Sequence, residues 1–112
     1  KFKPLQNGIS ITQFIEIAYL EDSSEKLIKN FSSGMKQRLR LALAWLTESS
    51  IVLLDEPISN LDKKGIDWYK DLATKHSKNK LVIVCSNYIK DEYFFCETSL
   101  HIEDFKTLKA SN

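Results

Sequence analysis

The apolar positions after residue 30 alternate between strand-like and helical patterns. Two short, continuous apolar runs, residues 51–54 and 81–85, are typical of parallel strands that are buried on both faces. Apolar residues also recur at helical spacing, which predicts two longer helices, one before each run. The apolar stripe of the first helix is Met35, Leu39, Ala42, Leu43 and Leu46. One face of the second helix is shared by Ile66, Tyr69, Leu72, Ala73 and His76.

Polar residues mark the start of both helices. Ser32 and Ser33 precede Gly34, where the first helix is expected to begin, and serine is a favoured capping residue. Asp62 is placed to cap the second helix in the same way. We therefore expect both helices to begin at residues that the sequence defines.

The first thirty residues lack the strand-like pattern and are predicted to be helical. Ser10 and Gln13 have the spacing of a capping box, and the apolar residues that follow predict a helix over residues 11–20. A weaker helical pattern covers residues 24–29. This part of the chain is therefore expected to be a helical appendage to the rest.

The order of the elements predicts an α/β fold. A short helix at residues 89–95 and a third strand at residues 99–102 are expected after the second apolar run. Strand, helix, strand, helix and strand in this order are typical of a parallel sheet with crossover helices.

Composition and charge exclude several classes of protein. The 112 residues include 16 Lys and Arg and 15 Asp and Glu, a net charge of +1, and 43% of them are hydrophobic. These values are ordinary for a globular domain, and they exclude a charged disordered tail and a bulk basic surface that wraps nucleic acid. No apolar run approaches the ~20 residues that a membrane-spanning helix needs.

The glycines exclude one way of binding a nucleotide within this chain. A phosphate-binding P-loop needs two glycines five residues apart, followed by Lys and then Ser or Thr. The three glycines, Gly8, Gly34 and Gly65, offer no such pair, and the Rossmann fingerprint fails by the same test.

Two adjacent carboxylates, Asp55 and Glu56, follow the first apolar run. Open α/β sheets bind ligands at the carboxyl ends of their strands, which is where this pair is expected to lie. Asp55 can hold Mg²⁺, directly or through water, and Glu56 can accept a proton from an attacking water. An acidic surface turn is the alternative that this pair alone leaves open.

A second candidate site lies at the start of the first long helix. Ser32, Ser33, Gly34 and Met35 place two hydroxyls and a glycine at a helix N-terminus, where free backbone N–H groups attract anions. An ordinary serine-capped helix is the alternative for this segment.

Together, the order and spacing of these segments resemble the C-terminal half of the ATP-binding subunit of an ABC transporter. Phe31–Met35 looks like the signature motif of the family, and Ile51–Asp55 looks like its Walker B strand. The resemblance implies that Asp55 serves Mg²⁺ and that Glu56 is the general base for the hydrolytic water. The D-loop, which crosses the dimer interface in the family, is then Ser59, Asn60, Leu61 and Asp62.

The resemblance also implies a fold and a division of the chain. The expected fold is part of a P-loop NTPase (RecA-like) core of three layers, with parallel strands and crossover helices. Residues 1–33 are then the end of the helical subdomain that carries the signature, and residues 34–112 are the C-terminal part of the ATPase core. A Walker A loop is expected upstream, and without that half the sheet is incomplete, so we expect an exposed apolar surface or self-association.

The sequence departs from the family pattern at several positions. Ser33 replaces the first glycine of the signature, and Met35 replaces its glutamine. Where the family places a switch histidine after the second strand, this chain has Ser86, Asn87 and Tyr88, and we assign Asn87 unless the alignment is off by one residue. An asparagine can donate a hydrogen bond to a phosphate but cannot become cationic, so slow hydrolysis is expected.

The function that the resemblance implies is ATP binding and hydrolysis, with Mg²⁺, coupled to transport. The implied partners are a transmembrane permease and a second ATP-binding subunit, identical or different, with no nucleic acid, on the cytoplasmic inner face of the membrane. One alternative is a non-catalytic interaction module that supplies signature and D-loop surfaces. Another is a soluble ABC ATPase that acts outside transport.

Overall fold

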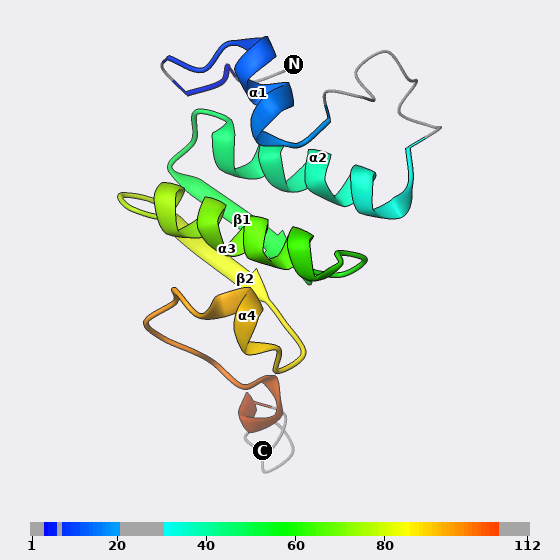
Figure 1. The fold of residues 1–112 in the computed structure, drawn as a ribbon. Coiled ribbons are helices and arrows are strands. Elements are labelled where there is room, and N and C mark those ends of the chain that lie inside the picture. Colours follow the sequence, from blue (N-terminus) through cyan, green and yellow to red (C-terminus); the bar gives the residue numbers. More distant parts are fainter. Residues whose placement is uncertain (1–3, 7, 21–30, 106–112) are drawn as a thin grey trace.

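The computed structural model describes residues 4–6, 8–20 and 31–105 (Figure 1). The predicted helix at residues 24–29 lies outside them. The elements in chain order are α1 (Ile11–Ile17), α2 (Ser33–Leu46), β1 (Ile51–Asp55), α3 (Lys63–His76), β2 (Leu81–Cys85) and α4 (Lys90–Tyr93).

The two strands form a parallel sheet, as the sequence predicts. The register runs from Ile51 opposite Leu81 to Asp55 opposite Cys85, and α3 connects the end of β1 to the start of β2. Because the strands are parallel and in this register, both end at the same edge of the sheet. The residues that follow β1 and β2 are therefore brought together at that edge.

The predicted caps are present at three helix starts. The Ser10 hydroxyl accepts the Gln13 N–H at 3.1 Å and the Gln13 side chain accepts the Ser10 N–H at 2.8 Å, which completes the capping box of α1. At α2 the Ser32 hydroxyl accepts the backbone N–H of Met35 at 3.2 Å. At α3 the Asp62 carboxylate accepts the Gly65 N–H at 2.8 Å.

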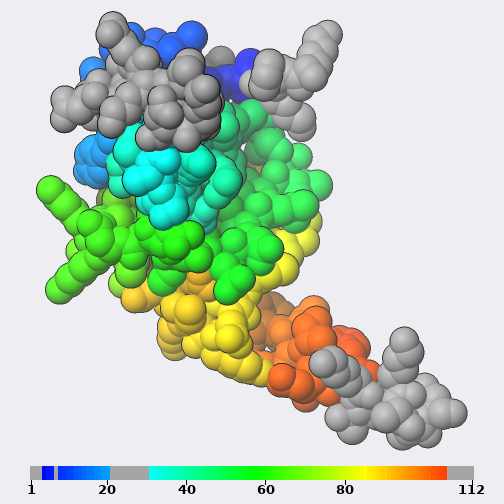
Figure 2. All heavy atoms as spheres, turned by 90° about the vertical axis from the view of Figure 1, so that its right-hand side faces the viewer, coloured from blue at the N-terminus to red at the C-terminus, as the bar shows by residue number. Residues whose placement is uncertain are grey.

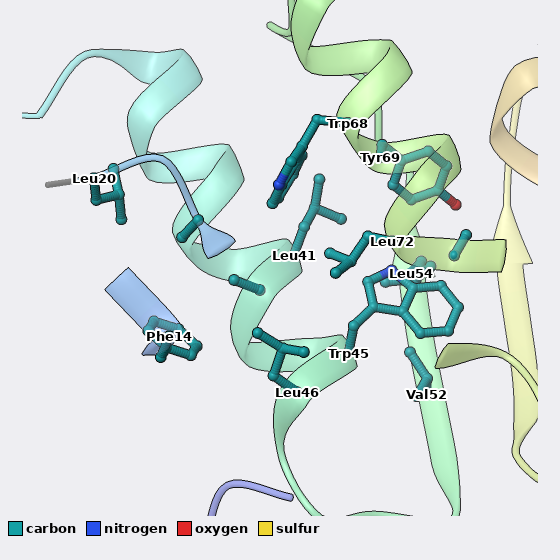
Figure 3. Packing of buried hydrophobic residues seen from close by; sticks show 13 residues of the cluster. Phe14, Leu20, Leu41, Trp45, Leu46, Val52, Leu54, Trp68, Tyr69 and Leu72 are labelled. Carbon is teal, nitrogen blue, oxygen red and sulfur yellow. The ribbon is translucent and has the colours of Figure 1, made fainter. Parts of the chain in front are cut away.

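The core lies where α2 packs against α3 and against β1 (Figure 3). The side chains at its centre are Leu41, Trp45 and Leu46 of α2, Val52 and Leu54 of β1, and Trp68, Tyr69 and Leu72 of α3. Trp68 also donates from its indole nitrogen to the Ile17 carbonyl at 2.6 Å, which ties α1 to α3.

The predicted apolar stripe of α2 is partly wrong. Leu43 is 47% exposed, whereas Leu41 and Trp45 are buried together with Ala42 and Leu46. Residues 37, 41 and 45, at i, i+4 spacing, form the buried face of α2 together with Ala42 and Leu46. This is the face that packs against α3 and β1. The α3 stripe is confirmed at Tyr69, Leu72 and Ala73, and Trp68 extends it.

The sheet is covered on one face only, which corrects the expectation that both faces of the strands are buried. Val52 and Leu54 of β1 are buried, but Ile51 and Leu53 are 53% and 70% exposed, and their β2 neighbours Leu81 and Ile83 are 58% and 49% exposed. The strands are thus not buried on both faces, and the described residues leave this face of the sheet largely open to solvent. The expected exposed apolar surface is present.

The predicted third strand at residues 99–102 is absent from the described fold. Residues 102–105 form a helical turn instead, and Leu100 and Ile102 are 74% and 68% exposed. Figure 2 shows this segment, in orange, projecting away from the body of the molecule. A strand needs a neighbour to complete its backbone hydrogen bonds, and this segment lies beside none.

Candidate functional site

Asp55, Glu56 and Asn87 meet at the carboxyl edge of the sheet. Together with Cys85 and Ser86 they line an open hollow of ≈ 370 Å³. Asp55 and Cys85 are the last residues of β1 and β2, and all three candidate polar side chains are exposed to solvent. The parallel register places one carboxylate pair and one amide side by side although 31 positions separate Glu56 from Asn87 in the sequence.

A tight turn after β1 sets the backbone of Glu56. Its N–H donates to the Cys85 carbonyl at 2.9 Å, which continues the strand ladder by one residue, and its carbonyl accepts the Ser59 N–H at 3.0 Å. The φ angle of Glu56 is 45°, in the left-handed region that non-glycine residues seldom adopt. Strain of this kind is common at functional sites, where the surrounding structure maintains it.

The signature-like segment lies at the start of α2 and does not line this hollow. Ser32 is the N-cap, Ser33 is the first helical residue, and both are exposed, whereas Gly34 and Met35 are half-buried. A Cβ atom built on Gly34 would lie 3.2 Å from the carbonyl oxygen of Asn60. The absence of a side chain at residue 34 therefore lets the start of α2 pack closely against the loop after β1.

The loop after β1 carries the predicted D-loop. Ser59 and Asn60 are exposed, Leu61 is half-buried, and Asp62 caps α3. Asn60 has a φ of 66°, so the loop contains a second left-handed residue four positions after Glu56. Residues 59–62 thus lie between the Asp55–Glu56 pair and α3, and Asn60 lies close to Gly34 of the signature-like segment.

Two buried polar residues that the sequence patterns did not single out hold this loop. The Gln37 side chain, on the buried face of α2, donates to the Pro57 carbonyl at 2.9 Å. The Glu92 carboxylate, 1% exposed, accepts the Ile58 N–H at 3.1 Å. The burial of Gln37 could have been found from its i, i+4 spacing to Leu41. Nothing in the sequence pattern indicates that Glu92 is buried.

Tyr88, one of the two neighbours of Asn87 in the sequence, faces elsewhere. The Tyr88 hydroxyl donates to the Glu103 carboxylate at 2.7 Å, and its ring stacks on His101 with 5.7 Å between centroids. This hydrogen bond to Glu103 raises the pKa of the Tyr88 hydroxyl. Tyr88 is not among the residues that line the hollow, whereas Asn87 is.

The oxygen atoms at the hollow can supply only some of the ligands of a Mg²⁺ ion, and water and phosphate oxygens would supply the others. Among the described residues no group of three His, Cys, Asp or Glu side chains is placed to hold a metal ion. Mg²⁺ is commonly held by one or two carboxylates, with waters and substrate phosphates as its other ligands. Asp55, an exposed carboxylate at the strand end, fits that mode of binding, and a cage made of protein alone does not exist in this part of the chain.

No helix in the part of the chain that the structure describes is long and apolar enough to cross a membrane.

Several known proteins with similar sequences are named as ABC transporter ATP-binding proteins. The model of the family described as ABC transporter matches residues 6–59. An uncharacterized ABC transporter ATP-binding protein of Bacillus subtilis, YybJ, is 30% identical over 91% of this chain and 47% of its own length. The bacitracin transport ATP-binding protein BcrA of Enterococcus faecalis is 34% identical over 79% of this chain and 30% of its own length.

A relative of a different kind is elongation factor 3 of Pneumocystis carinii, 32% identical over 88% of this chain and 9% of its own length. The chain spans less than half the length of each of these relatives. The chain is therefore similar, over part of its length, to an ABC transporter ATP-binding domain.

Proposed function

We propose that this chain supplies the hydrolytic half of an ATP site in the ATP-binding subunit of an ABC transporter. The observation that carries the proposal is the convergence of Asp55, Glu56 and Asn87 in one hollow at the carboxyl edge of the sheet. The family match and the relatives named as transport ATP-binding proteins support the same function.

Each residue of the hollow has a role that its chemistry allows. Asp55 would hold Mg²⁺, directly or through water, and the bound ion would neutralise phosphate charge. Glu56 is exposed beside it and accepts a proton from the attacking water. Asn87 donates a hydrogen bond from its amide to a phosphate oxygen, but it supplies no positive charge.

The remaining residues serve the contact between two subunits. Ser32, Ser33, Gly34 and Met35 offer a helix N-terminus to the phosphates of ATP held by the Walker A loop of a second ATP-binding subunit. The D-loop residues 59–62 contribute to the same interface. The second subunit is identical or different, and a membrane permease is driven from the cytoplasmic face. In this proposal residues 1–33 belong to the helical subdomain and residues 34–112 to the ATPase core.

Replacement of the general base tests the proposal. In the complete natural subunit with its partner, Glu56→Gln is expected to abolish ATP turnover while ATP binding persists. Glu48→Gln is the matched control, since Glu48 is an exposed glutamate before the amino end of the same strand. If Glu56→Gln turns over ATP at the wild-type rate, Glu56 is not the base and the proposal fails.

A non-catalytic interaction module is the second candidate, because the chain contains no P-loop glycine pair. Under our proposal the 112-residue chain alone binds Mg-ATP weakly or not at all. Tight binding in a calorimetric titration would contradict that. A wild-type complex that assembles through this chain but does not hydrolyse ATP would favour the module.

The match to elongation factor 3 bears on a third candidate, a soluble ABC ATPase that acts outside transport. Our proposal predicts no binding to RNA or DNA. Binding that weakens steeply as salt rises would support the soluble ATPase.

A further inference from the structure

We propose that Glu92 is a positioning residue. It fixes the loop that carries Glu56 relative to the loop that carries Ser86 and Asn87. The inference rests on the proposed function, because these are the two loops that line the candidate ATP site. Glu92 does not touch the hollow itself. It acts through hydrogen bonds to the backbone N–H of Ile58 and to the side-chain hydroxyl of Ser86.

Glu92 is a buried acid whose two carboxylate oxygens bond to different loops. Its side chain is 1% exposed, although it belongs to the short helix α4 near the surface. One oxygen, Oε2, accepts the backbone N–H of Ile58 at 3.1 Å, and the other, Oε1, accepts the Ser86 hydroxyl at 2.5 Å. A buried carboxylate is costly unless it is hydrogen-bonded, so the side chain is stable here only with both loops in place.

The two bonded groups lie next to the candidate catalytic residues. Ile58 is two positions after Glu56, in the same tight turn, and Ser86 directly precedes Asn87. The Ser86 hydroxyl also accepts the Ile89 N–H at 3.2 Å, which fixes the start of α4 relative to the loop. A shift of either loop therefore breaks a charge-assisted hydrogen bond to Glu92.

The backbone of Glu92 is itself fixed by the core. The Tyr69 hydroxyl, on a fully buried side chain of α3, donates to the Glu92 carbonyl at 2.7 Å. Burial, and next the nearby Glu92 charge, raise the pKa of Tyr69 far above its usual value, so the hydroxyl remains a donor even in alkaline solution. The bridge between the two loops is thus anchored to α3.

Hydrogen exchange at the Ile58 amide measures the bridge without any nucleotide. Glu92→Ala is expected to speed exchange of this amide about tenfold, because its acceptor is removed. Glu92→Gln is expected to recover most of the protection, since its amide oxygen accepts from Ile58 while its nitrogen donates to Ser86. Glu97→Ala, an exposed acid on the same segment, is the control and should leave the exchange rate unchanged.

A double-mutant cycle distinguishes a bridge from a residue that only fills space. Ser86→Ala is expected to speed Ile58 exchange about threefold in the wild-type background and to have no further effect in the Glu92→Ala background. If Ser86→Ala leaves the Ile58 amide unchanged in the wild type, or acts equally in both backgrounds, the bridge is refuted. Should Glu92→Ala fail to fold, Ser86→Ala in the wild-type background still decides, because an unchanged Ile58 exchange rate there refutes the bridge.

The complete subunit then tests the positioning role. Glu92→Ala is expected to lower the kcat of ATP hydrolysis about tenfold with the KM for ATP nearly unchanged, and Glu92→Gln is expected to restore much of the loss. An unchanged kcat together with a broken bridge would overturn the role. An inactive wild-type subunit whose exchange coupling is intact would refute the proposed function while it supports the bridge.

Discussion

Gln37 joins the signature-like helix α2 to the loop after β1, and its replacement by methionine tests that connection. The side chain is 9% exposed, and its amide nitrogen donates to the Pro57 carbonyl at 2.9 Å. Methionine has nearly the same volume and flexibility, so Gln37→Met removes the donor and leaves little cavity. The Pro57 residue is also buried, and its carbonyl then loses its partner.

The expected loss in the free energy of unfolding is about 1–2 kcal/mol. It comes from the bond to Pro57, whose buried carbonyl is left unpaired, and from the longer bond that Arg40 donates to the Gln37 side-chain oxygen at 3.4 Å. For a chain of 112 residues, this loss lowers the melting temperature by about 4–8 °C. Gln37→Glu is expected to be worse, because it places carboxylate oxygens against a carbonyl oxygen without a proton between them.

Urea unfolding of the wild type, both Gln37 variants and Leu43→Met measures these differences. Leu43 is an exposed position on the same helix, so its replacement should change the midpoint little. If Gln37→Met unfolds at the wild-type midpoint, the bond to Pro57 does not hold α2 against the loop, and the reasoning is refuted.

Three further predictions follow from the fold. Asp62→Ala removes the cap of α3 and should cost about 1 kcal/mol in urea unfolding, whereas Asp67→Ala, exposed on the same helix, should cost little. Burial, and next the charges of Lys80 and Lys75, lower the pKa of His76, while the charge of Asp71 acts in the opposite direction. As pH falls, His76 therefore takes up its proton at a higher pH in the unfolded chain than in the folded chain. This contribution to stability is complete above the unfolded pKa of about 6.5 and is lost as pH falls toward the lowered folded pKa. Melting temperatures at pH 8 and pH 5 should therefore differ less in His76→Gln than in the wild type, and equal differences would exclude His76. Because Leu53 and Ile83 expose apolar surface on neighbouring strands, the chain should self-associate, and Leu53→Ser with Ile83→Ser should reduce the association seen in sedimentation without lowering the unfolding midpoint.

Local sequence patterns predicted the elements and their starts well. The caps Ser10, Ser32 and Asp62 are confirmed because capping depends on residues within one turn of each other. The parallel pairing of residues 51–55 with 81–85 is confirmed because two short apolar runs on either side of a helix allow few other arrangements.

What depends on distant packing was predicted less well. Leu41 and Trp45, not Leu43, face the core, because the direction in which α3 and β1 lie decides which side of α2 is buried. Burial of the strands on both faces and a strand at residues 99–102 require neighbours that the described residues do not supply. Of the candidate site, the position of Asp55 and Glu56 at the strand end followed from the sequence, but the Glu92 bridge depends on three segments meeting in space.

Location of the metal of bound Mn-ATP in the complete subunit pair tests the central claim most directly. Mn²⁺ substitutes for Mg²⁺ at oxygen-rich sites, and its anomalous X-ray scattering identifies its position in a crystal. Our account predicts the ion beside the Asp55 carboxylate or a water bound to it, with the terminal phosphate facing Glu56 and Asn87. An ion and phosphates bound away from the carboxyl edge of β1 and β2 would contradict it.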